Sequence, residues 1–200
     1  LDYDATLVLT GRSELPAAEN CAAWLAEHSS DDPQAERVRR LAEIYAAAPG
    51  RVVYLSGHIA SVEHVEGLKN LIAEKYGRLD GILHAAAELE TRQLALRTKT
   101  AESLRKVLSA KVAGSLHLAK LLDAWPEARL VLLSSIGSLS GALSSGESDY
   151  AAGCRLQNHL AAKLRAEAGQ TVLVLQGGTE FSASEISALR APRQGRPAGG

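Results

Sequence analysis

The sequence is poor in the features that direct a chain to an oxidising compartment, a membrane or a nucleic acid. Its two cysteines, Cys21 and Cys154, are too few for a four-cysteine zinc site or a disulfide framework. No apolar run approaches the roughly 20 residues that span a bilayer, and residues 1–9 lack a basic lead followed by a long apolar stretch. The 22 basic and 23 acidic side chains leave a formal net charge of -1. These absences predict a cytoplasmic chain with neither nucleic acid nor membrane as a partner.

The sequence does contain short apolar runs that alternate with helical patterns. The runs are apolar at consecutive positions, which predicts strands covered on both faces. They are Thr6–Thr10, Arg51–Leu55, Leu79–Ala85, Arg129–Ser134 and Thr171–Leu175. Helices are predicted between them: two within Ala17–Ala48, one from Ser61 to Gly77, one over Thr100–Leu122 and one over Ala151–Ala168. This alternation predicts an α/β fold with a doubly wound parallel sheet, whose ligands bind beyond the carboxyl ends of the strands.

Residues at these strand ends are the candidates for a functional site. Arg12 and Ser13 follow the first strand, where a guanidinium can hold a phosphate or simply face solvent. Three alanines at 85–87 follow the third strand, where a flat ring can approach the backbone or a helix can pack closely. Ser135 follows the fourth strand and Tyr150 begins the next helix, so a hydroxyl and a phenol face the same crevice.

Five ordered stretches resemble the ketoreductase domains of modular polyketide synthases, a branch of the short-chain dehydrogenase/reductase superfamily. They are Leu7–Ser13, Gly77–Ala86, Ser109–Gly114, Val131–Ser135 and Asp149–Ala152. The resemblance implies a Rossmann-like catalytic subdomain over residues 1–181, which lacks the family's first strand, glycine-rich loop and helix. Residues 182–200, rich in Ser, Arg, Pro and Gly, are expected to form a flexible linker.

The resemblance also implies an NADPH-dependent reduction of a β-keto acyl thioester on an acyl carrier protein, beside neighbouring synthase domains. It makes Tyr150 the proton donor, Ser135 the hydroxyl that holds the substrate carbonyl, and Lys111 the cation that favours ionisation of the tyrosine. Ser138 is a second candidate for the carbonyl contact, because the stretch from 135 to 150 is longer than the family's. Cofactor contacts are implied for Arg12, Ser13, His58, Ile59, Ala85, Ala86 and Ala87.

Several positions depart from the family pattern, and they leave two hypotheses open. No G-x-G-x-x-G loop occurs, His58 replaces an acidic residue, Ala87 replaces a glycine and Cys154 replaces an asparagine. The first hypothesis is a working ketoreductase domain; the alternative is a catalytically silent scaffold of a megasynthase. An α/β-hydrolase is disfavoured, because Gly137–Gly141 carries leucine where the nucleophile elbow needs serine. The family's Leu-Asp-Asp motif, which is associated with one stereochemistry of the alcohol product, falls at residues 89–91. Only one acidic residue is present there, so the stereochemistry of the product stays open.

Overall fold

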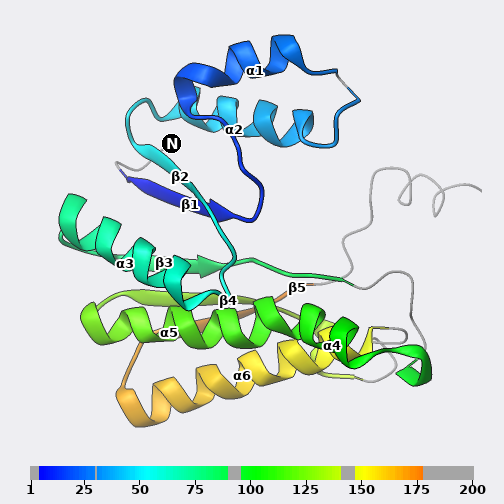
Figure 1. Cartoon of the computed structure of the whole chain (residues 1–200). Helices are drawn as coiled ribbons and strands as arrows, with labels where there is room; N and C mark the ends of the chain where they lie inside the picture. Colours follow the sequence, from blue (N-terminus) through cyan, green and yellow to red (C-terminus); the bar gives the residue numbers. More distant parts are fainter. Residues whose placement is uncertain (1–4, 30, 90–95, 141–146, 178–200) are drawn as a thin grey trace, which may run out of the picture.

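Parallel strands alternate with helices along the whole described part of the chain. The computed structural model describes residues 5–29, 31–89, 96–140 and 147–177. The strands are β1 (Leu7–Gly11), β2 (Val52–Ser56), β3 (Gly81–His84), β4 (Arg129–Ser135) and β5 (Val172–Gly177). The main helices are α1 (Cys21–Glu27), α2 (Ala35–Ala47), α3 (Val62–Lys75), α4 (Ala101–Leu108), α5 (Ser115–Ala124) and α6 (Ser148–Ala168). Figure 1 shows how these strands and helices are arranged. The described residues also form four short turns: η1 (Ala18–Asn20), η2 (Leu96–Thr98), η3 (Ser109–Gly114) and η4 (Ile136–Ser138).

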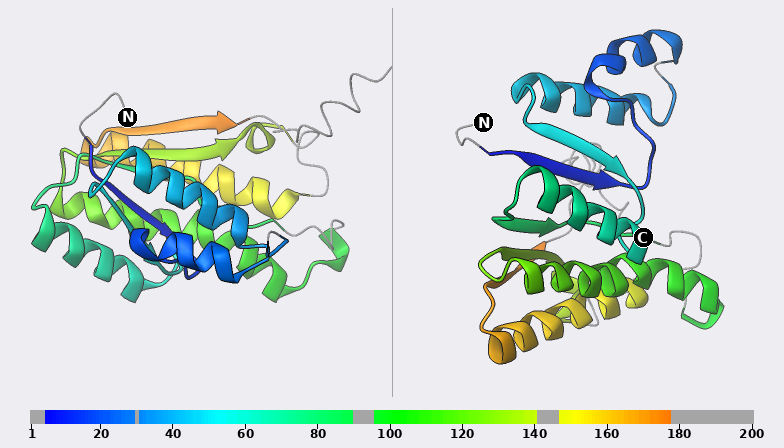
Figure 2. Two further views of the ribbon diagram at one scale, coloured as in Figure 1. Left: turned by 90° about the horizontal axis from the view of Figure 1, so that it is seen from above. Right: turned by 60° about the vertical axis from the view of Figure 1, so that its left-hand side comes forward.

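The strands form two sheets in the described residues, where the sequence predicts one. β1 pairs with β2, while β4 pairs with β3 on one side and β5 on the other. Every pairing is parallel, so the predicted α/β class with parallel strands is confirmed. Figure 1 and the right-hand view of Figure 2 place α1 and α2 together at the β1–β2 sheet, away from α5 and α6. One strand edge of β1 and one of β3 therefore carry no partner among the described residues.

Two hydrophobic clusters hold the helices against the strands. In the first, α5 and α6 pack on one face of β4 and β5, through buried residues that include Leu122, Leu130, Leu132, Ala161 and Val172. In the second, α3 and α5 meet around Val65, Leu68, Leu118 and Leu121. Val8 of β1 and Ile82 of β3 both contact this second cluster, so it joins the two sheets. Burial of these side chains is the main source of stability that the fold has available.

The opposite face of the three-stranded sheet is open among the described residues. Leu83, Leu173 and Leu175 are 66%, 50% and 51% exposed. They share this face because Leu83 and Leu173 are both paired to Val131, and side chains alternate along each strand. The prediction that every strand is covered on both faces is therefore wrong here. The apolar pattern shows that these strands can be buried on both faces. Among the described residues, helices cover only one face of the three-stranded sheet.

The helix ends follow predicted signals at some positions and depart from them at others. Ser61 caps α3 by accepting a hydrogen bond from the His64 N–H, and Gly77 ends it with φ at 69°. The helix predicted over Thr100–Leu122 is interrupted, because η3 is a π-helical turn between α4 and α5. α6 begins at Ser148, earlier than predicted, so Tyr150 lies inside its first turn.

Some predictions fall on residues outside the described ranges. These are the boundary at 181/182, the linker at 182–200, the Ser- and Gly-rich stretch at 141–146, and positions 90 and 91 of the stereochemical motif. Within the described ranges, no helix combines the length and the hydropathy that crossing a bilayer requires.

Candidate active site

The Lys111 side chain lies at the centre of the candidate site. Its residue is 1% exposed, and Nζ donates a hydrogen bond to the Leu133 carbonyl of β4 at 2.6 Å. α6 passes close by, since a Cβ added at Gly153 would lie 3.0 Å from the Lys111 Cβ. Glycine at 153 therefore allows α6 to approach the lysine closely. Burial lowers the pKa of Lys111 by removing water from the ammonium group.

Buried polar groups complete the π turn that carries this lysine. The Lys111 carbonyl accepts a hydrogen bond from the Ser115 hydroxyl, and Ser115 Oγ accepts one from Gln157 Nε2 at 2.8 Å. Ser115 and Gln157 are both fully buried, so each of these bonds replaces a lost contact with water. The position of Lys111 is thus fixed from α5 and α6 as well as from β4.

Tyr150 lies next to Lys111. The Lys111 Nζ is 5.5 Å from the centroid of the Tyr150 ring, within the range of a cation–π contact. Burial raises the pKa of Tyr150, and the charge of Cys154 and a side-chain hydrogen bond with it raise it further. The sequence predicts that Lys111 favours the ionised tyrosine, whereas the net shift in the pKa of Tyr150 is upward. The reason is that the Tyr150 phenol is desolvated and hydrogen-bonded to Cys154, while the Lys111 ammonium group donates to the Leu133 carbonyl.

The two candidate serines have different surroundings. Ser138 is 4% exposed, and its Oγ donates to Gln176 Oε1 and accepts from Asn158 Nδ2 at 3.0 Å. Ser135 is half-buried at the carboxyl end of β4, and its Oγ accepts the Gly137 N–H at 3.1 Å, which leaves the hydroxyl proton as a donor. Ser135 is therefore the better candidate for a carbonyl contact, and Ser138 belongs to a structural network.

Ser134, the neighbour of Ser135, connects β4 to the helix that carries the tyrosine. Its Oγ donates to the Cys154 carbonyl at 3.4 Å, one turn beyond Tyr150. Together with the hydrogen bond from Lys111 to the Leu133 carbonyl, this contact brings Lys111 and Tyr150 to the end of β4 that carries Ser135. The predicted catalytic residues thus come from neighbouring parts of the fold.

A basic pocket lies at the carboxyl end of β1. Its volume is about 240 Å³, and it is lined by Gly11, Arg12, Ser13, Leu15, Arg37 and Tyr54. Arg37 of α2 donates to Ser13 Oγ at 2.9 Å, and the Tyr54 hydroxyl donates to the Ser13 carbonyl at 2.7 Å. Arg12 and Ser13 were expected here from the sequence. Arg37 was not, because a helix arginine beside Arg39 and Arg40 has no distinguishing pattern.

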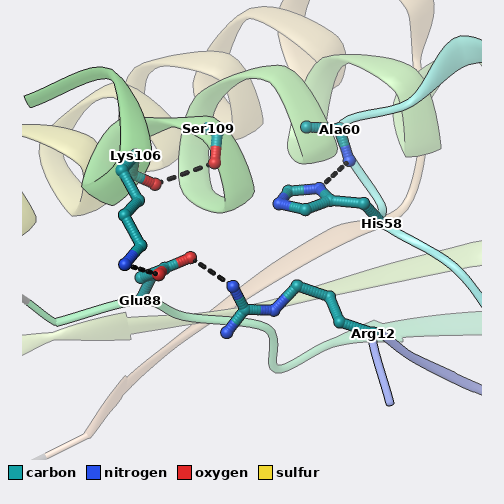
Figure 3. A network of polar contacts seen from close by, with 6 residues as sticks. All are labelled: Arg12, His58, Ala60, Glu88, Lys106 and Ser109. Atoms are coloured by element: carbon teal, nitrogen blue, oxygen red, sulfur yellow. Dashed lines mark hydrogen bonds and ion pairs between the residues drawn. The ribbon is translucent and has the colours of Figure 1, made fainter. Parts of the chain in front are cut away.

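Arg12 donates a hydrogen bond to a carboxylate that follows a strand of the other sheet (Figure 3). Glu88, which follows β3, accepts from Arg12 at 2.7 Å and contacts Lys106 of α4 at 3.1 Å. The Glu88 side chain is only 10% exposed. Burial alone would raise the pKa of Glu88, but the Lys106 hydrogen bond and the charge of Arg12 outweigh it and lower the pKa. The segments that follow β1 and β3, which belong to two separate sheets, are thus joined by an ion pair.

The other predicted cofactor residues have different surroundings. His58 follows β2, and its Nδ1 accepts the Ala60 N–H at 3.0 Å (Figure 3). Ile59 is 7% exposed and belongs to the second hydrophobic cluster, so its side chain serves the core. The alanines at 85–87 are all exposed after β3, at the edge where the other strand ends lie.

The fold is similar to that of solved dehydrogenase and ketoreductase structures. A short-chain dehydrogenase from Streptomyces avermitilis matches with a TM-score of 0.60 and 21% identity, over 92% of this chain and 75% of its own. PlmKR1, the ketoreductase from the first module of phoslactomycin biosynthesis in Streptomyces sp. HK803, matches with a TM-score of 0.66 and 25% identity, over 92% of this chain and 39% of its own. The fold is that of the short-chain dehydrogenase/reductase class.

Within that class the family is also shown. The family model described as KR domain matches residues 4–179, and the chain belongs to this ketoreductase family. Polyketide synthase PksL of Bacillus subtilis (strain 168) is 32% identical over 145 residues, which are 72% of this chain. The chain spans only 3% of the length of PksL. The resemblance predicted from the sequence is therefore confirmed.

Proposed function

We propose that this chain reduces the β-keto group of an acyl thioester to a hydroxyl group, with NADPH as the cofactor. The observation that carries the proposal is the Lys111 ammonium beside the Tyr150 ring, at the end of β4 that carries Ser135. A buried cation, a phenol and a hydroxyl at one strand end are the groups that stabilise and protonate a developing alkoxide.

Each residue has a distinct part in this reaction. A bound nicotinamide cofactor would supply the hydride that adds to the carbonyl carbon. Ser135 donates a hydrogen bond to the carbonyl oxygen as negative charge develops there. Tyr150 then transfers its phenolic proton to that oxygen, which completes the alcohol. The raised pKa of Tyr150 suits this role, because the phenol keeps its proton at neutral pH until a stronger base forms beside it.

Lys111 acts on the phenolate that the proton transfer leaves behind. An unpaired phenolate in a half-buried site is costly, and a cation 5.5 Å from the ring lowers that cost. Lys111 also donates to the Leu133 carbonyl, which holds the ammonium in place while the charge on the tyrosine changes. The lysine thereby supports both the transfer and the return of a proton to the tyrosine.

The basic pocket fits the 2′-phosphate of NADPH. Arg12 and Arg37 both line this pocket, and Arg37 donates to the Ser13 hydroxyl. A phosphate monoester takes paired hydrogen bonds from guanidinium groups. Exposed alanines at 85–87 leave the backbone after β3 open to a flat ring. Glu88 competes with the phosphate for Arg12, so cofactor binding requires the Arg12–Glu88 ion pair to open.

The substrate and the partners follow from the family. Relatives such as PksL are polyketide synthases, whose length far exceeds that of this chain. The proposed substrate is therefore a β-keto acyl thioester carried on an acyl carrier protein, and neighbouring synthase domains are the proposed partners. Residues 1–181 would form the catalytic unit and residues 182–200 a connecting segment.

The test is NADPH oxidation by the chain with a β-ketobutyryl thioester of N-acetylcysteamine, and with NADH for comparison. Tyr150→Phe should lower kcat by about 100- to 10,000-fold, because it removes the proton donor. Tyr76→Phe is the matched control, since the Lys75 Nζ also lies 5.5 Å from the Tyr76 ring, at the far end of α3. A Tyr150→Phe variant as active as the Tyr76→Phe control would refute the mechanism.

A silent scaffold is the second candidate, and one observation favours it. The Tyr150 phenol is hydrogen-bonded to Cys154, which stands where the family pattern has asparagine. Titration of the chain with NADPH by calorimetry separates the two functions. Binding that Arg12→Ala weakens supports the reductase, whereas no binding at any accessible NADPH concentration supports the scaffold.

A further inference from the structure

A buried ion pair lies beside Tyr150 and has no part in the function described so far. The Lys99 Nζ contacts Asp149 Oδ2 at 2.8 Å, and the two side chains are 0% and 2% exposed. The other carboxylate oxygen, Asp149 Oδ1, accepts the backbone N–H of Tyr150 at 3.0 Å. One carboxylate therefore binds both a distant lysine and the main chain of the proposed proton donor.

The pair joins two segments that are far apart in the sequence. Lys99 directly precedes Thr100, whose side chain caps α4 by accepting the Ser103 N–H. Asp149 lies in the first turn of α6. α4 and α6 pack against each other, so the ion pair fixes the starts of two contacting helices relative to one another.

Among the described residues, the first turn of α6 has no side-chain cap. Its N-cap residue, Glu147, makes no side-chain capping bond, so the first N–H groups of the helix depend on other acceptors. A carboxylate in the first turn is favourable there, because it faces the positive end of the helix dipole. Asp149 is buried, however, and a buried carboxylate needs a cation to offset its desolvation. Lys99 supplies that cation.

Stability alone gives little reason for charged residues at these positions. Replacing a buried ion pair by apolar side chains of similar volume is often neutral or stabilising. What an apolar pair cannot supply is an acceptor for the hydrogen bond that the Tyr150 N–H donates to Asp149 Oδ1. We propose that Lys99 and Asp149 are positioning residues, which hold the first turn of α6 so that the Tyr150 phenol faces Lys111 and the substrate carbonyl. This inference rests on the proposed reductase function.

The central experiment compares stability with turnover in an apolar double variant, Lys99→Met with Asp149→Leu, of the full chain. We expect its Tm to stay within about 5 °C of the parent chain, because no buried charge is left unpaired. We expect kcat to fall by about 100-fold with KM little changed, since a misplacement of about 1 Å in a reacting group has that effect. Lys99→Arg keeps the charge and should retain most of the turnover.

A matched control comes from the same helix. Lys163 and Glu167 form an exposed ion pair on α6, two-thirds exposed on each side, and Lys163→Met with Glu167→Leu should leave kcat and Tm unchanged. An apolar variant at 99 and 149 that folds and keeps the parent kcat would overturn the inference. The inference would also be overturned if kcat fell only in proportion to the folded fraction of the variant.

A second measurement keeps the inference testable if the parent chain shows no reductase activity, which would count against the proposed function itself. The ionisation of Tyr150 is followed by ultraviolet difference absorbance between each chain and its Tyr150→Phe counterpart. If the pair holds the phenol in its buried position, its removal should bring the pKa of Tyr150 down toward the ordinary value of about 10. An unchanged titration in the double variant would overturn the positioning role without reference to activity.

Discussion

Acid should weaken this fold through one buried histidine, and the size of the effect follows from its surroundings. His84, the last residue of β3, is 2% exposed, and its Nε2–H donates to the Ala110 carbonyl at 3.0 Å. Burial lowers the pKa of His84 to about 4; the hydrogen bond to Ala110 opposes this shift and the charge of Lys111 adds to it. The folded chain therefore holds His84 neutral.

In the unfolded chain a histidine has a pKa of about 6.5. The unfolded state thus binds the proton more strongly than the folded state, and stability is lost as the pH falls from about 6.5 to about 4. The shift of about 2.5 units corresponds to roughly 3 kcal/mol in total, of which about 2 kcal/mol is lost by pH 5. Carboxylates with a lowered pKa, such as Glu88, lose their contribution mainly below about pH 4.5, so the two effects separate.

The assay is urea unfolding at pH 8, 6 and 5 for the parent chain and for His84→Gln. The glutamine amide can still donate to Ala110 but does not titrate. The variant should lose about 2 kcal/mol less stability than the parent between pH 8 and pH 5. His64, whose pKa burial also lowers, acts in the same direction and is removed in a second His64→Gln series. Equal pH dependence in the parent and His84→Gln chains would refute the reasoning.

Further predictions concern three positions around the site. Gly153→Ala should lower kcat and cost about 1–3 kcal/mol of stability, because the new methyl group lies 3.0 Å from the Lys111 Cβ; kinetics and urea unfolding measure both. Ser138→Ala should cost about 1–3 kcal/mol in urea unfolding, because its asparagine partner loses an acceptor, while kcat per folded molecule stays constant. Glu88→Gln should tighten NADPH binding in calorimetry by releasing Arg12, and weaker binding would contradict the proposed competition.

Much of the fold is predictable because its signals are local. Each apolar run became a strand, and Ser61 and Gly77 bound α3 as expected, since capping and left-handed turns depend on a few adjacent residues. The division into two sheets and the open face at Leu83 and Leu173 were not predictable. The residues of a strand show whether its faces can be buried. Whether another element packs on each face depends on the rest of the chain.

The site divides in the same way. Lys111 and Tyr150 stand in motifs of adjacent residues, and the structure brings them together. Arg37 and Lys99 act through partners 24 and 50 positions away, so no local pattern marks them. The direction of the pKa shift of Tyr150 was also out of reach, because it depends on desolvation and on the bond with Cys154.

The π turn between α4 and α5 has a consequence for how this site can vary. A π turn closes its hydrogen bonds over one residue more than an α-helical turn, whereas each residue of an α-helix advances the chain by about 100°. Deleting one residue from η3 would let α4 and α5 join in a single α-helical register. Either Lys111 or the apolar face that carries Leu118 and Leu122 would then turn away from β4. The position of the Lys111 ammonium group thus depends on the number of residues in this turn. A one-residue deletion would test this dependence, whereas single substitutions keep the length of the turn unchanged.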